Sequence, residues 1–137
     1  MPALWRRYYD ICYNIYGKLG VDVNNKDSDD GSTALMGAVW RGENSIVKHL
    51  LDQPGVRINE KNLYGLTALH YAAGGNNPEG ARMLLFHPDM NSANSRNNKG
   101  ETAVIFSLRL SNKEVLHELV NHKSVSLDLR EGDLVWW

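Results

Sequence analysis

Apolar and small residues recur along this chain in a pattern that appears three times. The stretches DGSTALMGAV (30–39), YGLTALHYAA (64–73) and KGETAVIFSL (99–108) share one frame, in which a glycine and a threonine precede residues at helical spacing. A paired apolar ending closes each unit 20 residues after its glycine, at Leu50-Leu51, Leu84-Leu85 and Leu119-Val120. Apolar residues at i, i+1, i+4 and i+5 mark one face of an amphipathic helix. Each unit is therefore predicted to hold a short first helix and a longer second helix.

The spacing of the units predicts how they are assembled. Gly31, Gly65 and Gly100 are 34 and then 35 residues apart, and the helical part of each unit keeps its length. Packed helices cannot absorb insertions, whereas surface loops can, so the difference is expected in the connecting loop. Neither helix can bury its apolar stripe alone, so each unit must stack on the next. The pattern predicts an all-α repeat solenoid.

The frame G-x-T-A-L-H-x-A-A, followed by a helix that ends in Leu-Leu and then by an extended loop, resembles the ankyrin repeat. The resemblance extends over about residues 21–133 and is weakest in the third copy, which has TAVIFSL where the family has TPLHxAA. It implies a fold of helix-turn-helix units with hairpin loops. The implied boundaries are an N-terminal capping helix and hairpin (half-repeat) at 1–24, ankyrin repeats at 25–59, 60–94 and 95–128, and a C-terminal tail or partial cap at 129–137.

The C-terminal end of the array leaves three alternatives open. Repeat three has an apolar outer face, including Leu116 and Val120, and solenoids need a cover for such a face. Either residues 134–137 fold over it, or the natural array continues, or Trp136 and Trp137 bind a partner. We favour the cap or the continued array, because exposed apolar patches cost solubility.

Thr67 and His70 are the residues of the repeat that most resemble a catalytic pair. Thr33, Thr67 and Thr102 stand directly before the helical pattern, where a hydroxyl can accept from otherwise unpaired N–H groups. The family resemblance implies this capping role, and implies that His70 binds neighbouring backbone. Met36 and Ile105 replace His70 in the other repeats, and no nucleophile or orienting acid is patterned around it. We expect no catalytic residue and no enzymatic activity.

Composition narrows the classes of partner. The chain has 42% apolar and 23% charged residues and a net charge of −1, which gives no general attraction to nucleic acid or membranes. Cys12 is the single cysteine and the N-terminus lacks the apolar core of a signal peptide, so we expect a cytoplasmic, or nuclear, location.

One cysteine without a Cys/His spacing signature argues against a zinc site. Asp27, Asp29 and Asp30 lack the spacing of a calcium loop. We expect neither metal nor cofactor.

The resemblance places partner binding on a concave groove of hairpin tips and first-helix edges. Mapped by register, this surface is acidic in repeat one, apolar and aromatic in repeat two and more basic in repeat three. Tryptophan and tyrosine are frequent binding hot spots, so Trp40, Tyr64 and Leu66 are the predicted anchor. The full predicted set is Asp29, Asp30, Ser32, Trp40, Arg41, Leu63, Tyr64, Leu66, Lys99, Glu101, Arg109 and Leu110.

The leading interpretation is a non-enzymatic protein-interaction module, an adaptor or inhibitor that binds a partner protein as a monomer or within a heteromeric complex. A second interpretation is the ankyrin segment of a larger multidomain protein. A third is a ligand-binding protein or enzyme that uses the groove, although an elongated stack encloses little space. The resemblance also implies that Asn59 and Asn24 are similar to hairpin asparagines that a cytosolic hydroxylase modifies. The resemblance also implies that this hydroxylase prefers a leucine eight residues before the asparagine, and Leu51 stands there relative to Asn59.

Overall fold

The computed structural model describes residues 23–127, which form three pairs of helices and no strand. The predicted all-α repeat solenoid is confirmed in this part of the chain. The expected capping helix and the expected tail at 129–137 lie outside the described residues. The pairs are α2 (Ala34–Arg41) with α3 (Asn44–Leu51), α4 (Ala68–Gly74) with α5 (Pro78–Leu85), and α6 (Ala103–Arg109) with α7 (Lys113–Val120).

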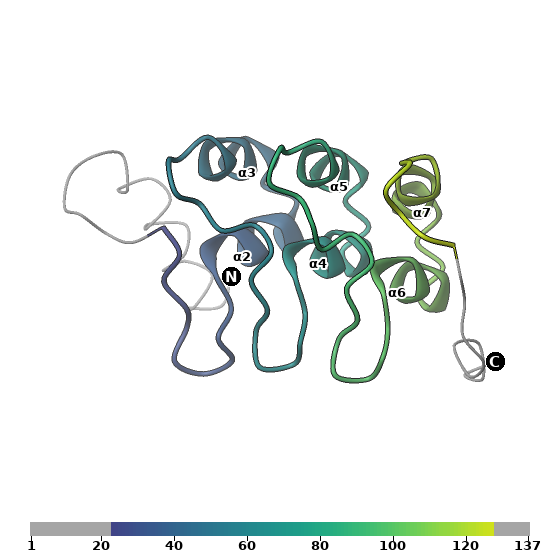
Figure 1. The fold of residues 1–137 in the computed structure, drawn as a ribbon, viewed down its shortest axis with the longest axis horizontal. Coiled ribbons are helices and arrows are strands. Elements are labelled where there is room, and N and C mark those ends of the chain that lie inside the picture. The colour runs from purple at the N-terminus through teal and green to yellow at the C-terminus, as the bar shows by residue number, and fades with distance from the viewer. Residues whose placement is uncertain (1–22, 128–137) are drawn as a thin grey trace.

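The three pairs stand side by side in two layers (Figure 1). One row holds α2, α4 and α6, and the other holds α3, α5 and α7. Before each first helix the chain makes a long loop that projects away from both rows, at the bottom of the figure. Equivalent helices pack on one another along each row, so every repeat contacts mainly its neighbours.

Local chemistry sets the ends of the helices. Thr33, Thr67 and Thr102 are N-caps, and each hydroxyl accepts from the backbone N–H three residues on, as predicted. Pro78 opens α5, where its missing N–H is not needed. The second helices have eight residues each and the first helices eight, seven and seven. The second helix is thus one residue longer than the first in repeats two and three and equal to it in repeat one. The predicted difference in length is small because turns follow the paired apolar residues at once.

The core lies between the two layers and continues from repeat to repeat. Val39, Val47, Leu50 and Leu84 are almost completely buried, and each such side chain stabilises the fold by about 1.5–3 kcal/mol. The small residues of the first helices are also buried, which lets neighbouring first helices approach closely. These are Ala34, Ala38, Ala68, Ala72, Ala73 and Ala103.

Hydrogen bonds between successive loops hold the hairpins in a row. The N–H of Leu63 donates to the carbonyl of Asp30 at 2.8 Å, and the N–H of Asn98 donates to the carbonyl of Tyr64 at 3.0 Å. The turn-closing bond spans four residues in repeat one, from Gly31 to Asp27, but three residues in the other repeats. Repeats two and three therefore have the same turn, and the extra residue between Gly65 and Gly100 lies in the loop after α5, because Asn94 follows Leu85 by nine residues whereas Asn59 follows Leu51 by eight. The difference falls in a connecting loop, as predicted.

Candidate protein-interaction surface

The tip of the second hairpin presents two large apolar side chains on an ordered loop. Leu63 is 67% exposed and Tyr64 is 60% exposed. Beneath them, the side-chain oxygen of buried Asn62 accepts from the N–H groups of Tyr64 and Leu66, both at 3.0 Å. The amide nitrogen of Asn62 donates to the hydroxyl of Tyr71 at 2.8 Å. This network fixes the tip, so its exposed side chains need little further ordering when a partner binds.

The first helices contribute three aromatic rings, Trp40, Tyr71 and Phe106, which we call the aromatic shelf. Trp40 lies in the last turn of α2 and meets Tyr71 of α4 edge to face, with ring centroids 5.9 Å apart. A Cβ atom on Gly74 would lie 3.0 Å from the Trp40 ring and 2.8 Å from the Phe106 ring, so both rings converge on this glycine. Trp40 nevertheless remains 43% exposed. The shelf thus crosses three repeats.

An ion pair borders the shelf in repeat three. The guanidinium of Arg109 lies 5.0 Å from the centroid of the Phe106 ring. Its Nε also donates to a carboxylate oxygen of Glu101 at 2.8 Å. Arginine can stack on an aromatic ring and bind a carboxylate at once because its guanidinium is planar. The pair orients Arg109 over the shelf and offsets part of its charge.

The structure distributes the predicted surface residues over three levels of accessibility. Asp29, Trp40, Arg41, Leu63, Tyr64, Lys99 and Leu110 are exposed. Asp30, Leu66, Glu101 and Arg109 are half-buried. The prediction for Ser32 is corrected, because this residue is buried. Its hydroxyl accepts from the Asn62 amide at 3.2 Å, so it joins two hairpins instead of facing a partner.

Sequence reasoning missed two members of the shelf, Tyr71 and Phe106. They occupy the register position of Gly37, three residues before Trp40, and the helical spacing of three residues places both positions on one face. That spacing was the available signal. Trp40 itself reaches the next repeat, where its ring packs over Gly74.

His70 is part of the architecture, as predicted. Its Nδ1 accepts from the N–H of Thr67 at 3.1 Å, so the neutral ring carries its proton on Nε2, which donates to the carbonyl of Glu101 at 2.8 Å. Burial lowers the pKa of His70 below its ordinary value of 6.5, although the bond to Glu101 acts in the opposite direction. The histidine therefore caps α4 and ties repeat two to repeat three.

Asn24 and Asn59 bridge consecutive loops. Asn59 donates to the carbonyl of Asp89 at 2.8 Å and accepts from the N–H of Asn91 at 3.1 Å. Asn24 makes the equivalent pair of bonds to the loop of repeat one, donating to the carbonyl of Gly55 and accepting from the N–H of Arg57. Hydroxylation of these asparagines stays a prediction, and an enzyme that reaches them must compete with these bonds.

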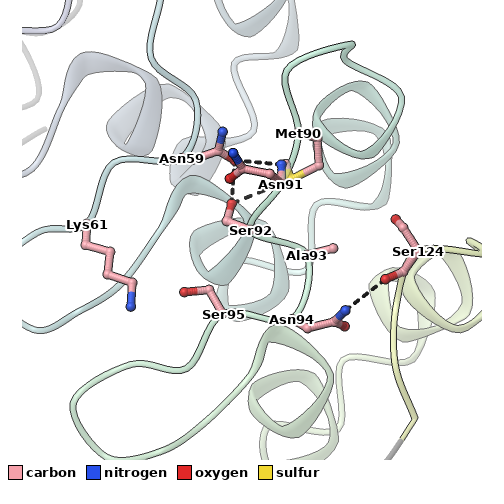
Figure 2. Close-up of a pocket in the computed structure, with 9 residues that line it drawn as sticks. All are labelled: Asn59, Lys61, Met90, Asn91, Ser92, Ala93, Asn94, Ser95 and Ser124. Carbon is pink, nitrogen blue, oxygen red and sulfur yellow. Dashed lines mark hydrogen bonds between the residues drawn. The ribbon is translucent and has the colours of Figure 1, made fainter.

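A shallow pocket of about 540 Å³ opens among the loops that follow the second helices (Figure 2). Of its lining residues Lys61 alone is ionisable, and its ammonium donates to the carbonyl of Arg96 at 3.3 Å. An acid–base pair is therefore not present in the lining. The lining residues are Asn59, Lys61, Met90, Asn91, Ser92, Ala93, Asn94, Ser95 and Ser124.

Between residues 23 and 127, no three His, Cys, Asp or Glu side chains gather closely enough to hold a metal ion. None of the helices found in this range is long and apolar enough to cross a membrane.

Comparison with known proteins agrees with this architecture. A family model for ankyrin repeats, three copies long, matches residues 1–94. The chain is also 31% identical over 139 aligned residues to the putative ankyrin repeat protein FPV031 of fowlpox virus (strain NVSL). That alignment covers 97% of this chain, but the chain spans only 38% of the length of the viral relative. Ankyrin repeats are generally protein-interaction modules. With its stacked helix pairs, threonine caps and this match, the chain belongs to the ankyrin-repeat family.

Proposed function

We propose that this chain is a non-enzymatic protein-interaction module, an adaptor or an inhibitor, which binds a partner protein through its hairpin tips and first helices. One observation carries the proposal: Trp40, Leu63 and Tyr64 are strongly exposed on the tips and the shelf. Large apolar side chains on an ordered surface cost solubility, and they are the types that dominate binding energy at interfaces.

The other features of the molecule support a binding role over catalysis. His70 is buried and has hydrogen-bond partners at both ring nitrogens, so it is not available to take a proton from a substrate. The pocket among the loops is shallow, and its lining combines amides and hydroxyls with one lysine. An active site in an enclosed cleft, with paired titratable groups, has no counterpart among residues 23–127.

A second proposal, compatible with the first, is that these repeats are one segment of a larger protein. The viral relative is more than twice as long as the part that aligns with this chain. In that arrangement the repeats position the rest of the protein on its partner. We further propose a cytoplasmic or nuclear location, and action as a monomer or inside a heteromeric complex, without direct contacts to nucleic acid or membrane.

The proposal is tested by affinity capture from cytosolic extract with matched variants. The test variant is Trp40→Ala/Leu63→Ser/Tyr64→Ala, which truncates only exposed side chains. The control is Phe86→Ala, because Phe86 is 71% exposed but follows α5 in the other row of helices. Circular dichroism must show that both variants fold.

We expect one specific protein to be captured by the wild type and by Phe86→Ala, and to be lost with the triple variant. Truncation of a hot-spot residue typically costs ~2 kcal/mol or more, so the loss should be nearly complete. Equal capture by all three forms would refute the proposed surface, and loss with Phe86→Ala alone would move the interface to the second helices.

A further inference from the structure

The glycines beneath the aromatic shelf are required by space and not by backbone conformation. Gly74 is the last residue of α4, and Gly75 has φ −89°, which any residue can adopt. Neither glycine has a positive φ, so neither backbone conformation calls for glycine. What the pair gains is room, because a Cβ atom on Gly75 would lie 2.9 Å from the carbonyl oxygen of Trp40. The aromatic shelf and these two glycines therefore form a closely packed apolar surface from repeat one to repeat three.

Charges flank this apolar surface in a fixed order. Asp30, Tyr64 and Lys99 occupy the same position in the three hairpins, one residue before the repeat glycine. Asp29, at the first tip, and Lys99, at the third, are both exposed. Neither forms an ion pair with another residue of the described part. Along the tips the surface is thus anionic, then apolar, then cationic.

The nearby cations on the helices do not reverse this order. Arg109 lies at the cationic end, and Glu101 pairs with it. Arg41 is in the last turn of α2, whereas Asp29 lies in the hairpin before that helix, so the two are at opposite edges of the surface. Neighbouring helices pack about 8–10 Å apart, so the tips of repeats one and three are separated by roughly 16–20 Å. An extended peptide crosses that span in about five or six residues.

We propose that the shelf and tips bind an extended peptide segment of the partner, with a large apolar side chain at its centre, a basic end over Asp29 and Asp30, and an acidic end over Lys99 and Arg109. This inference rests on the proposed function and specifies the chemistry of the partner. The apolar residue supplies the affinity, and the charges set the direction in which the segment lies.

The test uses fluorescence polarisation with labelled synthetic peptides. The probe carries two lysines, a Leu-Phe-Leu centre between single serines, and two glutamates. Its inner lysine and inner glutamate are six positions apart, which matches the span of about five or six residues between the tips. Three comparison peptides have both ends acidic, both ends basic, or serines in place of the centre. The protein variants are Asp29→Lys and Lys99→Glu. Both side chains are exposed and form no ion pair or side-chain hydrogen bond with the described part of the chain, so the fold is preserved.

At low salt, we expect the wild type to bind the bipolar probe about three- to fivefold more tightly than the peptide with two acidic ends or the peptide with two basic ends, as is typical of exposed charge pairs. Asp29→Lys should shift the preference to the acidic peptide, and Lys99→Glu should shift it to the basic one. The serine peptide should bind far more weakly than the probe. Added salt should reduce the charge preference without abolishing binding.

Three results would overturn the inference. These are a wild-type preference for a peptide with two acidic or two basic ends, an unchanged preference in both variants, or no binding of any peptide up to about 1 mM. A Kd of about 1 mM corresponds to a binding free energy of only −4.1 kcal/mol. If capture of a protein still depends on Trp40, Leu63 and Tyr64 in those cases, the proposed function stands and only the bipolar segment is wrong. If capture is also indifferent to them, both fail.

Discussion

The hairpin glycines offer a direct measurement of how strongly one repeat supports the next. Gly31, Gly65 and Gly100 have nearly the same φ, +74°, +75° and +79°, so alanine at each position meets the same backbone strain. That strain is about 1–2 kcal/mol for a residue with a Cβ atom. The three positions differ only in what the new methyl group would touch, which makes them a matched series.

The contacts of the added Cβ atom predict an uneven effect. At Gly65 it would lie 2.6 Å from Oδ1 and 2.8 Å from the backbone nitrogen of Asn98, in the next hairpin. At Gly31 the nearest atom is 3.6 Å away, and at Gly100 nothing lies within 4 Å. A backbone atom cannot swing away as a side chain can, so Gly65→Ala should cost about 1–3 kcal/mol more than Gly100→Ala, the usual cost of overpacking.

Urea denaturation of the three alanine variants, followed by circular dichroism, measures the free energies of unfolding. Gly31→Ala and Gly100→Ala should agree closely, and the free energy of unfolding of Gly65→Ala should be about 1–3 kcal/mol lower than that of either. Asn98→Ala in the Gly65→Ala background should restore only part of the loss, because it removes Oδ1 but not the backbone nitrogen. Three equal losses would refute the reasoning, since they would mean that the second and third hairpins separate freely.

Three other perturbations test the architecture. Because burial lowers the pKa of His70 below 6.5, the unfolded state binds more protons in acid, so the stabilisation from the neutral ring is complete above pH 6.5 and declines as the pH falls below it. Urea titrations on both sides of pH 6.5 should therefore show a steeper acid loss in the wild type than in His70→Met, the residue that repeat one has at this position, and equal losses would contradict this role. Asn62→Ala should lower the free energy of unfolding by about 2–4 kcal/mol, because it leaves buried groups unpaired, whereas exposed Asn98→Ala should cost less than half as much in the same assay. Thr102→Ala should cost about 1 kcal/mol by urea denaturation, and Thr67→Ala more, since Thr67 is fully buried and also pairs with the His70 ring.

Much of the fold could be predicted from the spacing of a few residues. The threonines marked the starts of the first helices because a hydroxyl before an apolar helical run satisfies N–H groups that the helix itself cannot. The paired apolar residues marked the ends of the second helices. The predicted difference in length between first and second helices is only one residue in two repeats and absent in the third, because turns stop the second helices directly after the apolar pairs, and periodicity does not encode where a turn begins.

The candidate surface could be predicted only in part. Leu63 and Tyr64 were placed correctly at the tip because hairpin position follows from register alone. Ser32 occupies an equally suggestive register position, yet it is buried, since Asn62 of the neighbouring hairpin reaches it. Contacts between residues 30 positions apart depend on how the repeats stack, and no local pattern contains that information.

The sequence by itself therefore determined the repeat, the caps and the need to stack, because these follow from the bonding and burial of residues close together in the chain. Only the tertiary structure decided that Trp40 and Phe106 converge on Gly74 and that His70 joins repeat two to repeat three. The physical reason is that both depend on atoms of adjacent repeats meeting at distances below 4 Å. Side-chain packing across an interface sets those distances, and helical or strand periodicity does not.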